Sequence, residues 1–179
     1  PFYQTNTWTY GGLNYRHQVF EQIPLVYNLE TDAIFIKKTV RDGLTTDQPI
    51  ALNAEQVESF TIFNKKFIYL NEKVDAFTSG FLELIYEGEM VSLLAKRTKE
   101  FEIDDNQQLN YLESHKYYLQ LDGSYYRIRK LSKLRTLFKA QKKEIKSYAK
   151  KNRIEVCRPE TDEQFKQLIV YCNQLLTSK

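Results

Sequence analysis

The chain has 179 residues, of which 42% are hydrophobic and 27% are charged, so it is long enough and apolar enough to bury a sizeable core. This composition excludes a disordered chain, and only six glycines and four prolines argue against long flexible linkers. No apolar run approaches the roughly 20 residues that a membrane-spanning helix needs. The 13 tyrosines and 11 phenylalanines favour a sheet-rich fold, because both residue types suit the half-buried surface of a β-sheet.

The net charge of +3 is unevenly distributed along the chain. Residues 1–126 contain 11 Lys/Arg against 18 Asp/Glu, whereas residues 127–153 contain 12 Lys/Arg against a single Glu. The sequence therefore predicts an acidic body joined to a strongly basic segment.

The N-terminal part of the chain predicts strands joined by short loops. Residues 1–12, PFYQTNTWTYGG, indicate an extended arm or an edge strand, and residues 13–129 predict a β-rich body. The dipeptide Asp42-Gly43 predicts a turn. The hairpins expected in this part pair residues 23–28 with 33–40, and residues 58–63 with 66–70 around Asn64-Lys65.

The central stretch, residues 81–96, reads FLELIYEGEMVSLLAK and predicts a hairpin with Glu87-Gly88 as a two-residue loop. Counting outward from that loop pairs Tyr86 with Glu89 and Ile85 with Met90. Both faces of the resulting hairpin are mainly apolar. We therefore expect it in the middle of a sheet that is covered on both sides.

A third hairpin is predicted around Asp122-Gly123, a dipeptide typical of a type I′ turn. Its register sets Leu121 against Ser124 and Tyr117 against Ile128. One face of this hairpin is apolar and predicts a core contact. The other face is expected to meet water or a partner, and it contains Tyr118, Gln120, Tyr125, Arg127 and Arg129.

The hydrophobic period changes to about 3.6 after residue 130, which predicts helices. We expect one helix at residues 131–138 with Ser132 as its cap, one at 144–151, and a third after Thr161. The third has an apolar stripe that contains Cys172, for which we expect a buried free thiol.

The fold class predicted from these elements is α+β. We expect an antiparallel, curled or partly closed sheet of about six to nine strands, built of hairpins and followed by three C-terminal helices. A single domain is expected over residues 1–179, in which the helical tail, residues 130–179, packs on the sheet.

Groups that could support catalysis are sparse in the sequence. His17 and His115 lie in polar surroundings without metal-ligand spacing, and Cys157 with Cys172 forms no metal signature. Asp104-Asp105 is expected to be a solvated pair in a polar loop. We therefore expect no catalytic residues, no metal site and no cofactor, and we predict that the protein is not an enzyme.

The basic segment is the feature with the clearest functional implication. The simplest interpretation of this segment is that it forms the solvated outer face of short helices. The next is that it docks onto an acidic protein surface. The third is that it contacts phosphates of lipid or nucleic acid. Tyr118 and Tyr125 beside the arginines could also form a base-stacking platform, although no nucleic-acid-binding motif supports one. The candidate partner-binding residues are Tyr118, Tyr125, Arg127, Arg129, Lys133, Lys142, Lys143 and Lys146.

Four runs carry a resemblance to a known group: LVYNLETDAIFI, FLELIYEGEMVSLLAKR, YYLQLDGSYYRIRKLSKLRTLFK and EIKSYAKKNRI. Over residues 23–176 the chain resembles small exported proteins of Bacteroidota, in which a β-rich body ends in a Lys-rich helical tail. That group has no assigned activity, so the resemblance implies location only: the periplasm or the outer membrane, behind an export signal. A chain that begins at Pro1 and has Met90 as its only methionine is consistent with a processed product.

These observations predict a non-enzymatic envelope protein, an accessory subunit of an outer-membrane or periplasmic assembly that meets an acidic partner. In this interpretation the aromatic N-terminal arm could add a strand to a neighbouring sheet. The first alternative is a carrier of an apolar or lipid-like ligand, which requires a pocket of several hundred Å³ lined by Phe and Tyr. The second alternative is nucleic-acid binding through residues 127–153, which requires affinity that falls steeply with salt.

Overall fold

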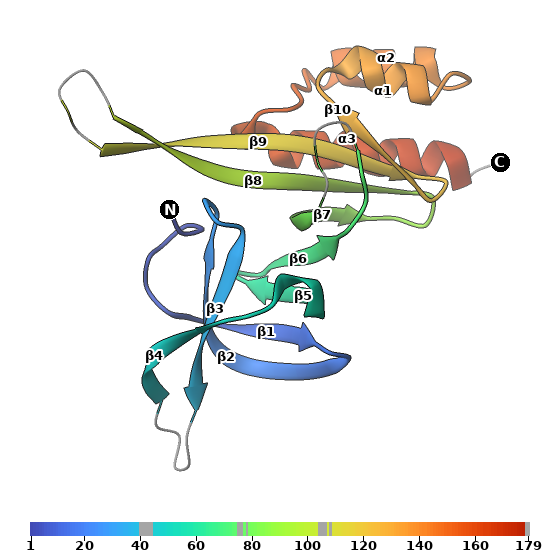
Figure 1. Ribbon diagram of the computed structural model, residues 1–179. Coiled ribbons are helices and arrows are strands. Elements are labelled where there is room, and N and C mark those ends of the chain that lie inside the picture. The colour runs from blue at the N-terminus through green and yellow to red at the C-terminus, as the bar shows by residue number, and fades with distance from the viewer. Residues whose placement is uncertain (40–44, 75–76, 78, 104–106, 108, 178–179) are drawn as a thin grey trace. The chain divides into compact units, whose positions relative to one another are not determined.

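The computed structural model describes residues 1–39, 45–74, 77, 79–103, 107 and 109–177 (Figure 1). Within these residues, ten strands form one open antiparallel sheet with the order β10-β9-β8-β7-β6-β5-β1-β2-β3-β4. The strands are β1 (Thr9–Tyr15), β2 (Gln18–Asn28), β3 (Ala33–Thr39), β4 (Thr45–Ala51), β5 (Val57–Ile62), β6 (Lys65–Leu70), β7 (Gly80–Glu87), β8 (Val91–Ile103), β9 (Leu109–Leu121) and β10 (Ser124–Ile128). Three α-helices follow: α1 (Leu131–Leu137), α2 (Lys142–Lys151) and α3 (Asp162–Thr177).

The predicted α+β class, with hairpins followed by three helices, is confirmed. The described sheet has ten strands rather than six to nine, and it is open, with β10 and β4 at its two edges. Strand β4, which contains Pro49, is one of the two edge strands. The expected turn at Asp42-Gly43 lies outside the described residues.

The chain forms two compact units, and strands β7, β8 and β9 each contribute residues to both. The first unit comprises residues 1–73, 78–83 and 97–114, and the second comprises residues 74–77, 84–96 and 115–179. Each unit has its own hydrophobic core. The prediction of one domain over residues 1–179 stays a prediction.

Aromatic rings dominate the core of the first unit. Phe60 and Phe67 stack with centroids 4.8 Å apart, and Tyr27 meets both rings edge-on at 5.1 and 5.2 Å. The two phenylalanines come together because β5 pairs with β6 in a register that sets Phe60 opposite Phe67. The loop of this hairpin is Phe63-Asn64, with φ angles of 51° and 58°, so the predicted loop at Asn64-Lys65 is wrong by one residue.

The N-terminal arm is bound to its own unit. The backbone N–H of Leu29 donates to the carbonyl of Pro1, and that of Tyr3 donates to the carbonyl of Tyr27, both at 2.9 Å. The ring of Tyr3 packs edge-on against Phe67. The first residues therefore already have strand-like partners within the chain, which argues against the expected use of the arm in a neighbour's sheet.

The β9–β10 hairpin of the second unit has the predicted register at every pair, from Leu121 opposite Ser124 to Tyr117 opposite Ile128. Asp122 and Gly123 have φ angles of 50° and 72°, as a type I′ turn requires. Tyr117, Leu119 and Ile128 are buried in a core that also contains residues of all three helices. Residues of the helices and of the strands thus share one core within this unit.

The predicted two-residue loop at Glu87-Gly88 is wrong. Strand β7 continues through Glu87 and β8 begins at Val91, so the connection has three residues, and two of them, Glu89 and Met90, were expected to be paired. The cause is a contact distant in sequence. The side-chain oxygen of Asn173 in α3 accepts hydrogen bonds from the backbone N–H groups of Met90 at 2.9 Å and Val91 at 3.2 Å.

Candidate interaction surface on the helical unit

Helix α1 is amphipathic, with an apolar side in the core and a polar side on the surface. Leu134 is fully buried, and Phe138, directly after the helix, is 3% exposed. The helix begins after Lys130, without a side-chain cap, so the expectation that Ser132 caps it is wrong. Ser132 instead lies inside the helix. It begins a polar series at spacings i, i+3, i+4 and i+7 that continues through Arg135, Thr136 and Lys139.

Helix α2 is amphipathic in the same sense. Ile145 and Ala149 are buried in the core, and Tyr148 stacks on Tyr171 of α3 with centroids 4.0 Å apart and planes 8° from parallel. The lysines of α2 are all exposed. The predicted helix at 144–151 is confirmed, with a start two residues earlier.

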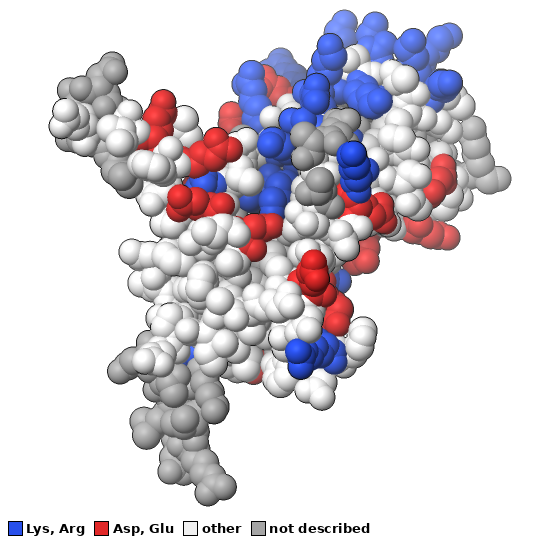
Figure 2. Space-filling model, in the orientation of Figure 1, with Lys and Arg blue, Asp and Glu red and all other residues white. Residues whose placement is uncertain are grey.

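We define the basic surface as the Lys and Arg side chains of α1, α2 and the link between them. Figure 2 shows blue side chains gathered over these two helices. In the described part of the chain, no ion pair joins these side chains to a carboxylate. The basic surface consists of Lys133, Arg135, Lys139, Lys142, Lys143, Lys146, Lys150 and Lys151. Arg135 is half-buried, and the other seven are exposed.

A hollow of about 520 Å³ lies within the basic surface. It is lined by Ser132, Arg135 and Thr136 of α1, by Lys139 in the link after that helix, and by Lys142 at the start of α2. The Nε atom of Arg135 is buried and has no hydrogen-bond partner among the described residues. The hydroxyl of Thr136 donates to the carbonyl of Ser132 at 3.0 Å, one turn earlier.

The structure places the predicted partner-binding residues in different environments. Lys133, Lys142, Lys143 and Lys146 belong to the basic surface, and Arg129, just before α1, is also exposed. Tyr125 and Arg127 are half-buried on β10.

The prediction that Tyr118 is exposed is wrong. Tyr118 is 1% exposed, and its ring lies 5.6 Å from that of Phe77. Phe77 is 41 positions earlier in the sequence, so the strand alternation around Tyr118 gave no indication of this cover. The predicted base-stacking platform of Tyr118 and Tyr125 is lost, because a buried ring cannot stack on a base.

Of the residues that line the hollow, sequence reasoning selected only Lys142 as a candidate. Ser132 and Thr136 are uncharged, and neither entered the charge pattern from which the candidate residues were chosen. The helical spacing of Ser132, Arg135, Thr136 and Lys139 was the available signal, since positions three and four apart share one side of a helix.

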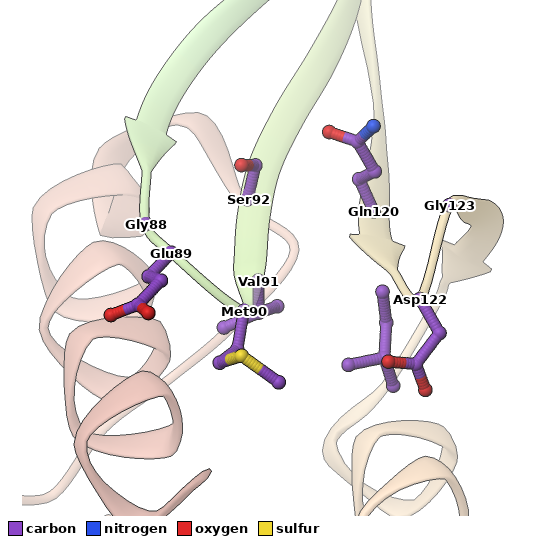
Figure 3. A pocket seen from close by; sticks show the side chains of 9 residues that line it. Gly88, Glu89, Met90, Val91, Ser92, Gln120, Asp122 and Gly123 are labelled. Carbon is purple, nitrogen blue, oxygen red and sulfur yellow. The ribbon is translucent and has the colours of Figure 1, made fainter. Parts of the chain in front are cut away.

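A second pocket, of about 220 Å³, lies where the β7–β8 and β9–β10 connections end (Figure 3). Met90 and Ser92 line one side of it, and Gln120 and Asp122 line the other. The side chain of Glu89 extends away from Asp122 in this view.

Groups suited to metal binding are dispersed in the described residues. His17 is exposed beside Glu58, with Nδ1 at 3.3 Å from the carboxylate, and His115 is half-buried. No group of three or more His, Cys, Asp or Glu in the described chain is placed to hold a metal ion. The expected loop pair Asp104-Asp105 lies outside the described residues.

Both cysteines are free thiols. Burial raises the pKa of Cys172 to about 12 and that of Cys157 to about 11. Reactive thiols need a lowered pKa, so neither has the character of a nucleophile. The buried free thiol expected for Cys172 is confirmed.

Comparison with known proteins gives no relative for this arrangement. No protein family model, no curated protein and no solved structure matches the chain. Among the described helices, none combines the length and the apolar character that crossing a membrane would need.

Proposed function

We propose that the chain is a non-enzymatic interaction protein of the cell envelope, an accessory subunit that binds an acidic protein surface through the basic surface of α1 and α2. The observation that carries the proposal is the exposure of many like charges on two short neighbouring helices, without ion pairs in the described residues. Like charges at this density repel one another, and an acidic partner would relieve that repulsion. The envelope location rests on the resemblance to exported proteins.

The mechanism would be electrostatic complementarity. Exposed lysines steer an acidic partner into encounter and set its orientation, while contributing less to the final affinity than buried contacts. The association rate should therefore fall steeply as salt is added.

Mild crosslinking in the native cell, followed by purification from the solubilised envelope and mass spectrometry, tests this proposal. The expected result is stoichiometric recovery of an outer-membrane protein, lost in a Lys142→Glu, Lys143→Glu, Lys146→Glu variant. The matched control changes the same three lysines to Arg, which keeps the charge and should keep the partner. Recovery of the chain alone from a soluble fraction, or equal recovery with both variants, would contradict the proposal.

The carrier alternative has less support. It needs a cavity lined by Phe and Tyr, whereas the rings of the first unit contact one another at centroid distances of 4.8 to 5.9 Å. The nucleic-acid alternative keeps the basic surface but loses its stacking platform with Tyr118. Binding to single-stranded DNA or RNA that weakens steeply with salt would revive it.

A further inference from the structure

The hollow on the basic surface brings together hydrogen-bond donors with three positive charges. Arg135, Lys139 and Lys142 supply the charges, and Ser132 and Thr136 supply hydroxyl groups. The Thr136 hydroxyl is engaged with the carbonyl of Ser132, so the Ser132 hydroxyl is the better placed donor. Among the residues that the structure describes, no Asp or Glu lines the hollow.

Arg135 gives the hollow a specific feature that the exposed lysines lack. The Arg135 side chain lines the hollow. Its Nε–H group is buried and has no acceptor in the described chain. A buried donor without a partner destabilises the fold, more so when the group is charged, and such groups in folded proteins usually have an explanation. An anion in the hollow would balance the positive charge that the delocalised guanidinium shares with this buried nitrogen.

We propose that this hollow binds the phosphate group of an organic phosphomonoester. At neutral pH such a group has a charge near −2 and three acceptor oxygens, which suits an arginine fork with two lysine point charges. A carboxylate has one charge and two oxygens, and would leave more of the positive charge unbalanced. The volume of about 520 Å³ leaves room beside the phosphate for the group that bears it.

This inference goes beyond the proposed function and can hold without it. Docking onto an acidic protein would use the whole basic surface, including Lys143, Lys146, Lys150 and Lys151, which do not line the hollow. Binding of a small phosphate ester would depend on the lining residues alone.

Nuclear magnetic resonance of the full chain tests the proposal, since arginine Nε–H groups are observed directly in proton–nitrogen spectra. Glycerol 3-phosphate should shift the Arg135 Nε–H signal in a saturable manner, with inorganic phosphate as a second probe and acetate as the carboxylate probe. Tighter binding of glycerol 3-phosphate than of inorganic phosphate is the expected result. Saturable binding of inorganic phosphate alone would overturn the organic ligand, and acetate binding as tightly would overturn the phosphate class.

The decisive variant is Lys142→Gln, because Lys142 is exposed and its replacement leaves α1 intact. Its matched control is Lys146→Gln, one turn further along α2, with the same loss of charge outside the hollow. Loss of one charge-assisted hydrogen bond should weaken binding by about tenfold in Lys142→Gln, against about twofold or less in Lys146→Gln. Equal weakening in the two variants, or a shift that never saturates, would overturn the proposal.

Discussion

The buried ion pair of the first unit shows what one residue contributes. Glu83, 2% exposed, accepts a hydrogen bond from Arg97 Nε at 2.9 Å, and Lys65 approaches its other oxygen at 3.4 Å. Arg97 is itself 4% exposed. A buried pair of this kind adds little net stability over an apolar pair of similar size, but removing one member leaves a charge in a poorly solvating interior.

Replacing Glu83 with Ala should therefore destabilise the protein by about 3 kcal/mol, whereas Lys65→Met, at the solvent-exposed end, should cost less than about 1 kcal/mol. Urea unfolding at pH 7 measures both. The double variant Glu83→Leu, Arg97→Met should be more stable than Glu83→Ala, since it removes both charges. A double variant that is no more stable than Glu83→Ala would contradict this account.

Cys172 predicts how stability depends on pH. Burial raises the pKa of its thiol from an ordinary value of 9.0 to about 12 in the folded chain. Above pH 9 the unfolded chain loses this proton while the folded chain keeps it, so stability falls between pH 9 and 12. The free energy of unfolding should fall by up to about 1.4 kcal/mol per pH unit more steeply in the wild type than in Cys172→Ala. Urea titrations between pH 8 and 10.5 measure the slopes, and parallel curves would contradict the prediction.

At the scale of elements, the two hairpin turns of the second unit differ in what determines them. Gly123 has a φ of +72° and open space around its Cα, so the conformation alone selects glycine. At Gly88 a Cβ atom would lie 2.7 Å from both the Asn173 side-chain oxygen and the Val91 carbonyl, so space selects glycine there. The conformation of the turn at Gly123 is therefore determined locally, whereas that of the turn at Gly88 depends on a contact with α3.

This contrast predicts opposite responses to the same substitution. Gly123→Asn should change stability by less than about 1 kcal/mol, because Asn tolerates the left-handed region. Gly88→Asn should cost several times more, because a backbone atom blocks its side chain. Thermal unfolding followed by circular dichroism compares the two, and equal losses would contradict the assignment of space as the cause.

Asn173→Ala tests the α3 contact itself. It removes the acceptor for two backbone N–H groups and should cost about 1–3 kcal/mol. Hydrogen exchange should then accelerate at Met90 and Val91 but not at Gly123, which serves as the internal control. Unchanged exchange at Met90 and Val91 would show that the side chain does not hold this connection.

The same contrast explains how far the sequence predicts the structure. The Asp122-Gly123 hairpin was predicted pair by pair, because a type I′ turn depends on its own two residues. The Glu87-Gly88 loop and the exposure of Tyr118 were wrong, because Asn173 and Phe77 act from distant positions. In the candidate site, the exposed lysines followed from charge and helical period. The hollow did not, since it depends on how α1 turns toward the start of α2.

At the scale of the whole molecule, the chain passes between the two units several times. The second unit is assembled from residues 74–77, 84–96 and 115–179, and its core includes Val91, Leu93 and Ala95 of β8. The helices therefore cover apolar residues that come from a strand far earlier in the sequence.

This organisation predicts that residues 115–179 do not fold alone. The fragment retains β10 and the three helices but loses the β8 residues of its core, and should show no cooperative thermal transition and a weak near-ultraviolet dichroism signal. The full chain is the control. A cooperative transition in the fragment would show that β8 is dispensable for the helical core.

Pro49 lies on β4, an outermost strand of the sheet, opposite Lys37 of β3. An outermost strand offers unpaired backbone groups to any other chain, and a proline there removes one donor from that row. Another copy that tried to extend the sheet past β4 would find its hydrogen-bonding pattern interrupted. A proline at position 49 should therefore make this edge a poorer template for aggregation.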